Sequence, residues 1–332
     1  MHWSQFGPPG GERCTIPGSD HLRLDKFGDG ERCTAPIALL WPTRGARCTS
    51  GAGETRNTVP VLTILNQKGG VGKTSTCHHL GGTLALLGQR VLLVDNDPQA
   101  SLTQGLFGPS AARSLDPATT VAAVLAGELL EPSRVIRPSG MSGVDLLPAS
   151  GRAASYNVPD PHLTDWDAQV ALRDFLAELG DNYDLVLIDC PPNLHLCSWA
   201  ALVASDYVLV PLQPEDYGAQ GIADVQASIS RVQSGPNPGL KLLGFLITMR
   251  SARRTVHQLF EENLRLLYGE AVFTATVPEA PEFPEAIMKR LPIAAYKPRG
   301  AAAKSIRALA DELLKRLGLG LTEGQERGRG AA

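Results

Sequence analysis

One segment constrains the fold of this chain more than any other: an apolar run that leads into a glycine-rich turn ending in Gly-Lys-Thr. Residues 61–66 have the composition of a buried strand, and a run with helical periodicity follows the turn. Glycines let the backbone of such a turn wrap closely around an anion, toward which the N–H groups at the helix start point. The segment therefore predicts a loop that binds a triphosphate. The alternative is an ordinary glycine-rich turn between a strand and a helix.

The side chains of this loop have separate expected roles. Lys73 lies where its ammonium group can bridge the terminal phosphates, and Thr74 supplies a hydroxyl for Mg²⁺. ATP and Mg²⁺ are therefore the expected cofactors. The residues expected to bind the nucleotide are Lys68, Gly69, Gly70, Val71, Gly72, Lys73, Thr74 and Ser75.

From Val59 onward, short apolar runs alternate with longer segments of helical periodicity, which is typical of a parallel sheet covered on both faces. The predicted strands are residues 61–66, 90–95, 185–189, 207–211, 242–248 and 272–276. The predicted helices are residues 74–87, 169–179, 196–204, 219–233, 255–268 and 302–317. The predicted fold class is α/β, with one domain over 59–317 built on a doubly wound, mostly parallel sheet flanked by helices.

Two further predicted strands end in acidic residues, Asp95 and Asp97 after one and Asp189 after the other. The C-terminal ends of parallel strands meet in the crevice where α/β sheets bind ligands. Asp189 is expected to hold Mg²⁺ through water, and Pro191 and Pro192 to stiffen the loop so that it moves as a unit when the γ-phosphate is lost. The alternative for Asp95 is a structural carboxylate that caps the next helix.

The run Lys68-Gly69-Gly70-Val71-Gly72-Lys73-Thr74 resembles the deviant Walker A box shared by ParA, MinD, the nitrogenase iron protein and ArsA. This resemblance implies that Lys68 reaches across an ATP-bound, face-to-face homodimer to the phosphates of the other copy; a solvated lysine is the alternative. Residues 91–99 resemble switch I of the family, which implies that Asp97 orients or deprotonates the attacking water. It also implies that Asp95 supports magnesium and the switch geometry. The catalytic residues implied are Lys68, Lys73 and Asp97, and the metal-binding residues are Thr74, Asp95 and Asp189.

Among these branches, the chain resembles the ParA partition ATPases over nearly all of 59–317, including residues 208–221, 244–249 and 292–296. One departure is that Pro278-Glu279-Ala280 stands where family members commonly have Pro-Arg-Asn. Pro278 and Glu279 are still the expected contacts of the adenine.

The rival branches have features that this sequence lacks. MinD ends in an amphipathic helix that binds membrane, whereas residues 317–332 contain no aromatic anchor, so membrane binding is not expected. Cys190 and Cys197 do not sit in the motif that holds the iron–sulfur cluster of the iron protein. ArsA usually carries two ATPase units, and one is present here.

The case for DNA binding rests on arginines, because the net charge of the whole chain is only −3. Residues 231–316 hold 14 Lys or Arg against 8 Asp or Glu, so this part can offer a basic face to phosphates. Four arginines resemble sites of phosphate contact in the family: Arg231, Arg250, Arg253 and Arg254. The alternative is a solvated charged surface.

The sequence thus predicts a partition ATPase of chromosomes or plasmids that dimerises with ATP and binds double-stranded DNA without sequence preference. The resemblance implies a ParB-like partner that stimulates a slow hydrolysis and so releases the DNA. Six cysteines without a CxxC pair indicate the cytoplasm, where the protein is expected to associate with the nucleoid. A MinD-like positioning ATPase and a metabolic P-loop enzyme are the alternatives.

Residues 1–58 are rich in Gly, Pro, Arg and Thr and lack periodicity, which predicts a disordered extension. Arg-Cys-Thr recurs in them at 13–15, 32–34 and 47–49, with uneven spacing. Our hypothesis is that translation starts at Val59 and that these phrases are translated DNA repeats; a flexible DNA-binding arm is the alternative. No helix-turn-helix domain is expected in this extension, nor is transcriptional repression. Residues 318–332 are expected to form a flexible polar tail.

Overall fold

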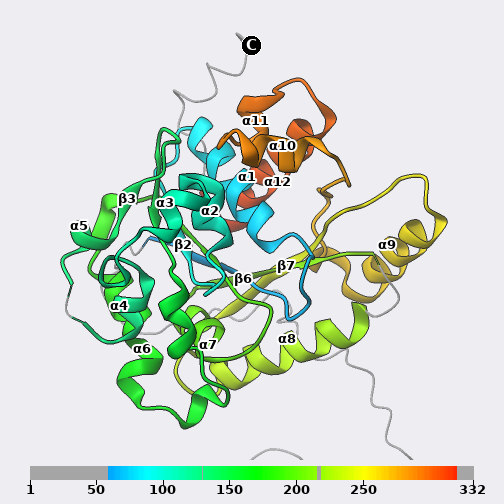
Figure 1. Cartoon of the computed structure of the whole chain (residues 1–332). Coiled ribbons are helices and arrows are strands. Elements are labelled where there is room, and N and C mark those ends of the chain that lie inside the picture. The colour runs from blue at the N-terminus through cyan, green and yellow to red at the C-terminus, as the bar shows by residue number, and fades with distance from the viewer. Residues whose placement is uncertain (1–58, 129, 215–217, 320–332) are drawn as a thin grey trace, which may run out of the picture. The chain divides into compact units, whose positions relative to one another are not determined.

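A seven-stranded sheet is the centre of the computed structural model, which describes residues 59–128, 130–214 and 218–319 (Figure 1). The strands are β1 (Val61–Ile64), β2 (Val91–Asp95), β3 (Arg137–Pro138), β4 (Val144–Leu147), β5 (Leu185–Asp189), β6 (Tyr207–Leu212) and β7 (Lys241–Ile247). Their order is β3-β4-β2-β5-β1-β6-β7, in which β3 is antiparallel to β4 and the other neighbours are parallel. The predicted mostly parallel sheet is confirmed.

Helices pack on both faces of this sheet. They are α1 (Lys73–Leu86), α2 (Ser101–Phe107), α3 (Pro109–Arg113), α4 (Val121–Leu125), α5 (Pro132–Val135), α6 (Trp166–Ala177), α7 (Leu196–Ala204), α8 (Gly218–Gln233), α9 (Thr255–Tyr268), α10 (Glu282–Met288), α11 (Ile293–Tyr296) and α12 (Ala301–Leu317). No helix within the described ranges has both the length and the apolar character needed to cross a membrane.

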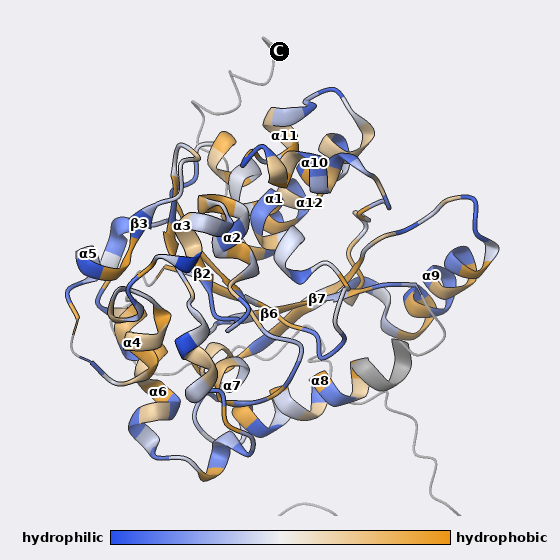
Figure 2. Cartoon of the chain, in the orientation of Figure 1, coloured by the Kyte–Doolittle hydropathy of each residue, from blue (hydrophilic) through white to orange (hydrophobic). Residues whose placement is uncertain are grey.

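Alternation of side chains along the strands divides the core into two clusters. Val61 and Leu65 join the cluster formed with α4, α6, α7 and α8, whereas Leu62 and Ile64 join the one formed with α1, α2, α10, α11 and α12. Figure 2 shows apolar residues along the strands and polar residues on the outward sides of the helices. The doubly wound arrangement is therefore confirmed.

The strand order also places the predicted site. β5 lies between β1 and β2, so the ends of these three strands are adjacent. Asp189 at the end of β5 pairs in register with Ile64 on one side and with Asp95 on the other. The acidic strand ends therefore lie beside the glycine-rich loop that follows β1.

Several elements differ from the sequence prediction. β3 and β4 were not predicted, because they contain two and four residues and carry no long apolar run. Helices α2 to α5 and the short α10 and α11 were also not predicted, since four to seven residues are too few for a clear helical period. The extension 1–58, with its repeated phrase, and residues 320–332 of the tail lie outside the described residues.

The predicted strand over 272–276 is wrong. This segment runs beside β7 but pairs with it at an isolated bridge between Phe245 and Val272 rather than along a regular ladder. Gly244 explains part of the irregularity: a Cβ there would lie 2.3 Å from the Ala271 carbonyl oxygen, so the two backbones approach too closely for a regular ladder.

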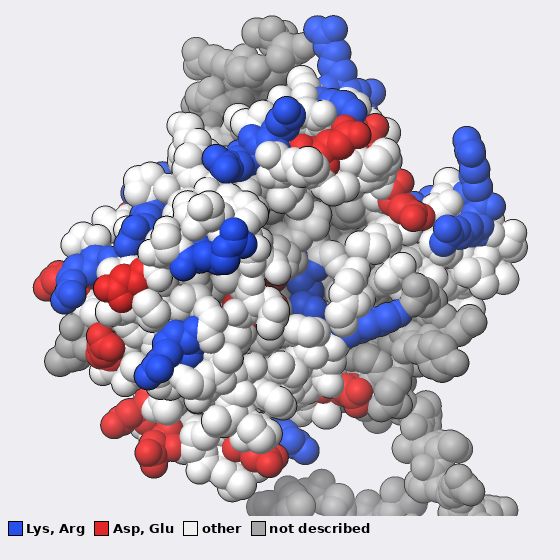
Figure 3. Space-filling view, viewed as in Figure 1, with Lys and Arg blue, Asp and Glu red and all other residues white. Residues whose placement is uncertain are grey.

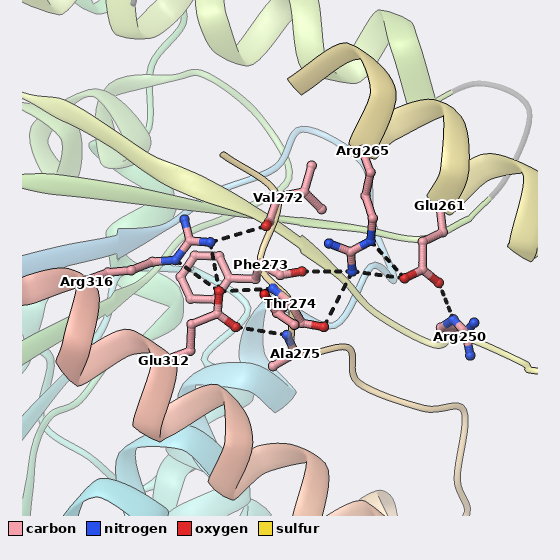
Figure 4. Close-up of polar contacts among 9 residues, drawn as sticks. All are labelled: Arg250, Glu261, Arg265, Val272, Phe273, Thr274, Ala275, Glu312 and Arg316. Atoms are coloured by element: carbon pink, nitrogen blue, oxygen red, sulfur yellow. Dashed lines mark hydrogen bonds and ion pairs between the residues drawn. The ribbon is translucent and has the colours of Figure 1, made fainter. Parts of the chain in front are cut away.

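Side chains replace the missing ladder, as Figure 4 shows. The Glu312 carboxylate on α12 accepts hydrogen bonds from the backbone N–H groups of Thr274 and Ala275, at 3.0 and 2.9 Å. Arg316 donates to the Val272 carbonyl oxygen at 3.2 Å and to Glu312 at 2.7 Å. Arg265 on α9 donates to the Phe273 carbonyl oxygen at 3.1 Å. The Phe273 N–H still donates to the Phe245 carbonyl oxygen on β7 at 2.8 Å, so side chains satisfy only the polar groups of this segment that β7 leaves unpaired.

Replacing Glu312 by glutamine should lower the free energy of unfolding by about 2 kcal/mol, since each carboxylate oxygen accepts from a different backbone N–H and the amide nitrogen would replace one of these two acceptors. Urea denaturation measures the loss. Glu262→Gln, a matched change at an exposed glutamate of α9, should alter the free energy of unfolding by less than about 0.5 kcal/mol. Equal effects of the two changes would contradict the structural role given to Glu312.

Candidate active site

The loop between β1 and α1 has the backbone conformation of a phosphate-binding loop. Gly70 and Gly72 have φ values of 78° and 86°, a region that other residues rarely adopt. No atom lies within 4 Å of the position that a Cβ would take at Gly69 or Gly70, so the space above the loop is open. The first N–H groups of α1 follow directly, which gives the loop an anion-binding end.

Two side chains fix this loop to the neighbouring strands. Asn66 donates from Nδ2 to the Pro211 carbonyl oxygen on β6 at 2.6 Å, and its Oδ1 accepts from the Lys68 N–H at 2.9 Å. Thr248, just after β7, donates to the Val71 carbonyl oxygen at 2.8 Å. The loop is therefore held in place from the β6–β7 side of the sheet.

The two lysines of the loop have opposite environments. The Lys73 side chain is buried, and its Nζ donates to the Lys68 carbonyl oxygen at 3.0 Å. Burial lowers the pKa of Lys73, while the nearby Asp189 opposes that change. Lys68, by contrast, is exposed at the rim of the loop.

Three buried carboxylates lie at the ends of β2 and β5. Asp95 accepts from the N–H and the hydroxyl of Thr103, at 2.7 and 2.6 Å, so one of its oxygens is already engaged by α2. Asp97 accepts from the Gln99 N–H at 2.9 Å. Neither carboxylate oxygen of Asp189, which is fully buried, has a hydrogen-bond partner within the described residues.

Burial and neighbouring charges raise the pKa values of Asp95 and Asp189. Burial raises the pKa of Asp189 well above its usual range, and the charge of Asp95 adds to the rise. The Thr74 hydroxyl lies close enough to offset part of that rise, without the geometry of a hydrogen bond. Burial also raises the pKa of Asp95 to about 7, which the hydrogen bonds from Thr103 oppose. A cation beside Asp189 would relieve this arrangement, so these residues fit Mg²⁺.

The protein alone does not surround a metal ion, because the described residues hold no group of three or more His, Cys, Asp or Glu side chains suited to one. This fits magnesium in particular, which is usually held by one or two protein groups together with substrate phosphates and water.

A pocket of about 370 Å³ opens beside the phosphate-binding loop. Gly72 and Ser75 line it together with Pro278 and Glu279, the two residues predicted to contact the adenine, and that contact stays a prediction. Its remaining lining is largely apolar and comes from α1, the residues just after β7, the loop before α10, α10 itself and α12: Thr76, Thr248, Met249, Val277, Ala280, Phe283, Pro284, Ile287 and Ile306. A flat apolar ring system fits such a lining.

The four arginines predicted to contact DNA have different surroundings. Arg253 and Arg231 are exposed, the first before α9 and the second near the end of α8. Arg254 lies 3.7 Å from the Glu279 carboxylate, with both side chains exposed. Arg250 is engaged within the protein, since its Nε donates to Glu261 at 2.5 Å (Figure 4). On the face in Figure 3, basic side chains are scattered, and some project over the loop that precedes α9.

The structure brings together Lys73, Asp95, Asp97 and Asp189, whose charges influence one another. Sequence reasoning missed the residues that support them: Asn66, Asn96, Thr103 and Thr248. Asn66, Asn96 and Thr248 could have been found, since each is a polar residue that ends or directly follows a predicted strand; Thr103 carried no such signal.

Known proteins resemble this chain in sequence and in fold. Residues 59–242 match a family model described as an AAA domain. The chain is 40% identical over 256 residues to the chromosome-partitioning ATPase Soj of Thermus thermophilus, covering 77% of this chain and 96% of that protein. It is 34% identical over 263 residues to the chromosome partitioning protein ParA of Caulobacter vibrioides, covering 78% and 96% of the two chains.

One of the similar solved structures contains a bound nucleotide and a metal ion. Cobyrinic acid a,c-diamide synthase from Mycobacterium smegmatis, with bound ADP and magnesium, aligns at a TM-score of 0.65 and 32% identity, covering 79% of this chain and 96% of that one. The residues of the present site fit the same kind of ligand, ATP with Mg²⁺. The chain therefore belongs to the Soj/ParA family of P-loop ATPases.

Proposed function

We propose that this ATPase partitions chromosomes or plasmids, and that ATP joins two copies face to face into the form that binds double-stranded DNA. One observation carries the proposal: the same loop holds one buried lysine, Lys73, and one exposed lysine, Lys68, at its rim. A buried lysine serves the phosphates of its own site, whereas an exposed one can serve those of a second copy. The names of relatives that this chain matches at 34–40% identity support the partition role.

The site residues divide the work of hydrolysis. Asp189 and Thr74 would hold magnesium, which when bound would neutralise charge on the phosphates. Asp97 would orient the attacking water and accept its proton, since burial raises the pKa of this carboxylate and so increases its basicity. Asp95 would act on geometry, because Thr103 already occupies one of its oxygens.

The apolar pocket beside Ser75 would hold the adenine. Pro278 and Glu279 line it where the family commonly has Pro-Arg-Asn, so contacts with the base would come from the ring of Pro278 and from backbone groups of this loop. Phe283 and Ile287 add apolar surface to the same pocket.

DNA would be held by arginine contacts to its phosphates, which carry no sequence information. Arg253 and Arg231 suit this role best because both are exposed. Arg254 is a secondary candidate beside Glu279, and Arg250 is the weakest of the four because Glu261 holds its guanidinium. Pairing of two copies would double the contacts, which raises affinity steeply and makes it dependent on salt. A ParB-like partner would then stimulate hydrolysis and release the DNA at the nucleoid.

Reversing the charge of Arg253 to glutamate should reduce ATP-dependent retention of DNA at least about tenfold, since repulsion replaces attraction to a phosphate. Arg231→Glu should have a similar but smaller effect. Filter retention of a random duplex measures binding, and sedimentation should show an intact ATP-dependent dimer for both variants. Arg113→Glu, at an exposed arginine of α3, is the matched control and should bind DNA normally. Full retention by both test variants would refute this DNA surface.

A further inference from the structure

Asn96 lies between the two acidic residues at the end of β2 and contacts two other parts of the site. Its backbone N–H donates to the Asp189 carbonyl oxygen at 2.9 Å. Its side-chain Nδ2 donates to the Cys197 carbonyl oxygen at 2.6 Å. The residue is fully buried, so water does not compete for either hydrogen bond.

The two acceptors stand at opposite ends of one loop. Asp189 precedes residues 190–195, which contain the two prolines, and Cys197 lies in the first turn of α7, directly after them. Asn96 therefore fastens both ends of this loop to the segment that carries Asp97.

The end of the loop next to α7 is held by further hydrogen bonds, which involve Asn157 and Asn193. Asn157 accepts from the Cys197 N–H through Oδ1 at 3.1 Å, and the Asn193 carbonyl oxygen accepts from the Ser198 hydroxyl at 2.6 Å. The first turn of α7 is thus held from two sides, by Asn96 through a carbonyl oxygen and by Asn157 through an N–H. Of these two residues, only Asn96 also adjoins a residue expected to act on water.

Folding alone does not account for an asparagine at this position. Its Oδ1 is buried and has no hydrogen-bond partner within the described residues, which destabilises the folded state. A leucine of similar size would remove the unpaired oxygen, although it would also leave the Cys197 carbonyl oxygen without its donor. The presence of a side-chain amide with an unpaired Oδ1 is therefore explained by the hydrogen bond that its Nδ2 donates to the Cys197 carbonyl oxygen.

We infer that Asn96 is a positioning residue that ties the Asp97 segment to both ends of the 190–195 loop, so that the two move together when the terminal phosphate is lost. The inference rests on the proposed role of Asp97 in hydrolysis. It concerns coupling between two loops of one site, for which a mutational cycle is the appropriate test.

The test compares Asn96→Leu with Asn237→Leu. Asn237 donates from Nδ2 to the carbonyl oxygens of Leu202, Val203 and Ser205 at the opposite end of α7, so it is a matched control that lies away from the acidic strand ends. Asn96→Leu should lower kcat for ATP hydrolysis about 10-fold to 100-fold, with KM for ATP changed less than about threefold. Asn237→Leu should lower the melting temperature by roughly 5 °C and leave kcat unchanged.

A double variant separates positioning from a general loss of structure. Because Asn96 acts through Asp97, adding Asn96→Leu to Asp97→Ala should lower kcat no further. A wild-type kcat for Asn96→Leu overturns the inference, as does a kcat loss of equal size in Asn237→Leu. Failure of the proposed function would be distinct, since the wild-type chain would then hydrolyse ATP without retaining DNA.

Discussion

Replacing Lys73 by alanine should weaken ATP binding about 100-fold or more and abolish hydrolysis, because we expect this buried ammonium to contact the terminal phosphates. In the structure its Nζ donates to the Lys68 carbonyl oxygen, a bond that it can exchange for one to a phosphate. Calorimetric titration with a non-hydrolysable ATP analogue measures the loss. ATP affinity within a few-fold of wild type would contradict this role.

Lys68→Ala is the informative control, since it removes the other lysine of the same loop. Lys68 is exposed at the rim, so the variant should bind ATP nearly as tightly as the wild type. Without a lysine to reach the second copy, it should sediment as a monomer in saturating ATP. A normal ATP-dependent dimer would refute the assignment of Lys68 to the partner's phosphates.

Replacing Asp97 by alanine should slow ATP hydrolysis about 100-fold or more and leave the protein bound to DNA for as long as ATP is present. The carboxylate expected to orient water is removed, whereas Asp189 and Thr74, the residues expected to hold magnesium, remain. Single-turnover hydrolysis and dissociation from immobilised DNA measure the two effects.

Asp97→Asn tests the chemistry behind this result. The amide oxygen can still accept from the Gln99 N–H, so the local backbone is preserved, but an amide cannot take a proton from water. We expect it to be as slow as Asp97→Ala. If either variant instead lost its affinity for ATP and magnesium, Asp97 would be a metal ligand and its role in orienting water would be wrong.

The core of the fold could be predicted because its signals are local. The strand before Lys68, the glycines after it and the acidic ends of β2 and β5 each lie within a few consecutive residues. Parallel topology then requires these strand ends to lie at one edge of the sheet. The proximity of Lys73, Asp95, Asp97 and Asp189 could therefore be predicted without coordinates.

The rest depends on contacts between distant segments, which a single sequence does not reveal. The segment 272–276 has the composition of a strand, yet Glu312 and Arg316 from α12 satisfy part of its backbone, and no local pattern shows this. In the same way, Thr103 engages Asp95 from α2, and Asn96 reaches the start of α7. Whether an arginine can contact DNA also depends on residues elsewhere in the sequence, since the Glu261 carboxylate already binds the Arg250 guanidinium.

The most direct test of the account is retention of a random DNA duplex by the wild-type chain in ATP, in ADP and without nucleotide, at a fixed moderate salt concentration. The proposed assembly predicts strong retention with ATP and Mg²⁺, at least about tenfold weaker retention in the other two states, and loss of binding as salt rises. Hydrolysis of ATP with equally weak DNA retention in all three states would contradict the central claim and favour the alternative of a metabolic P-loop enzyme.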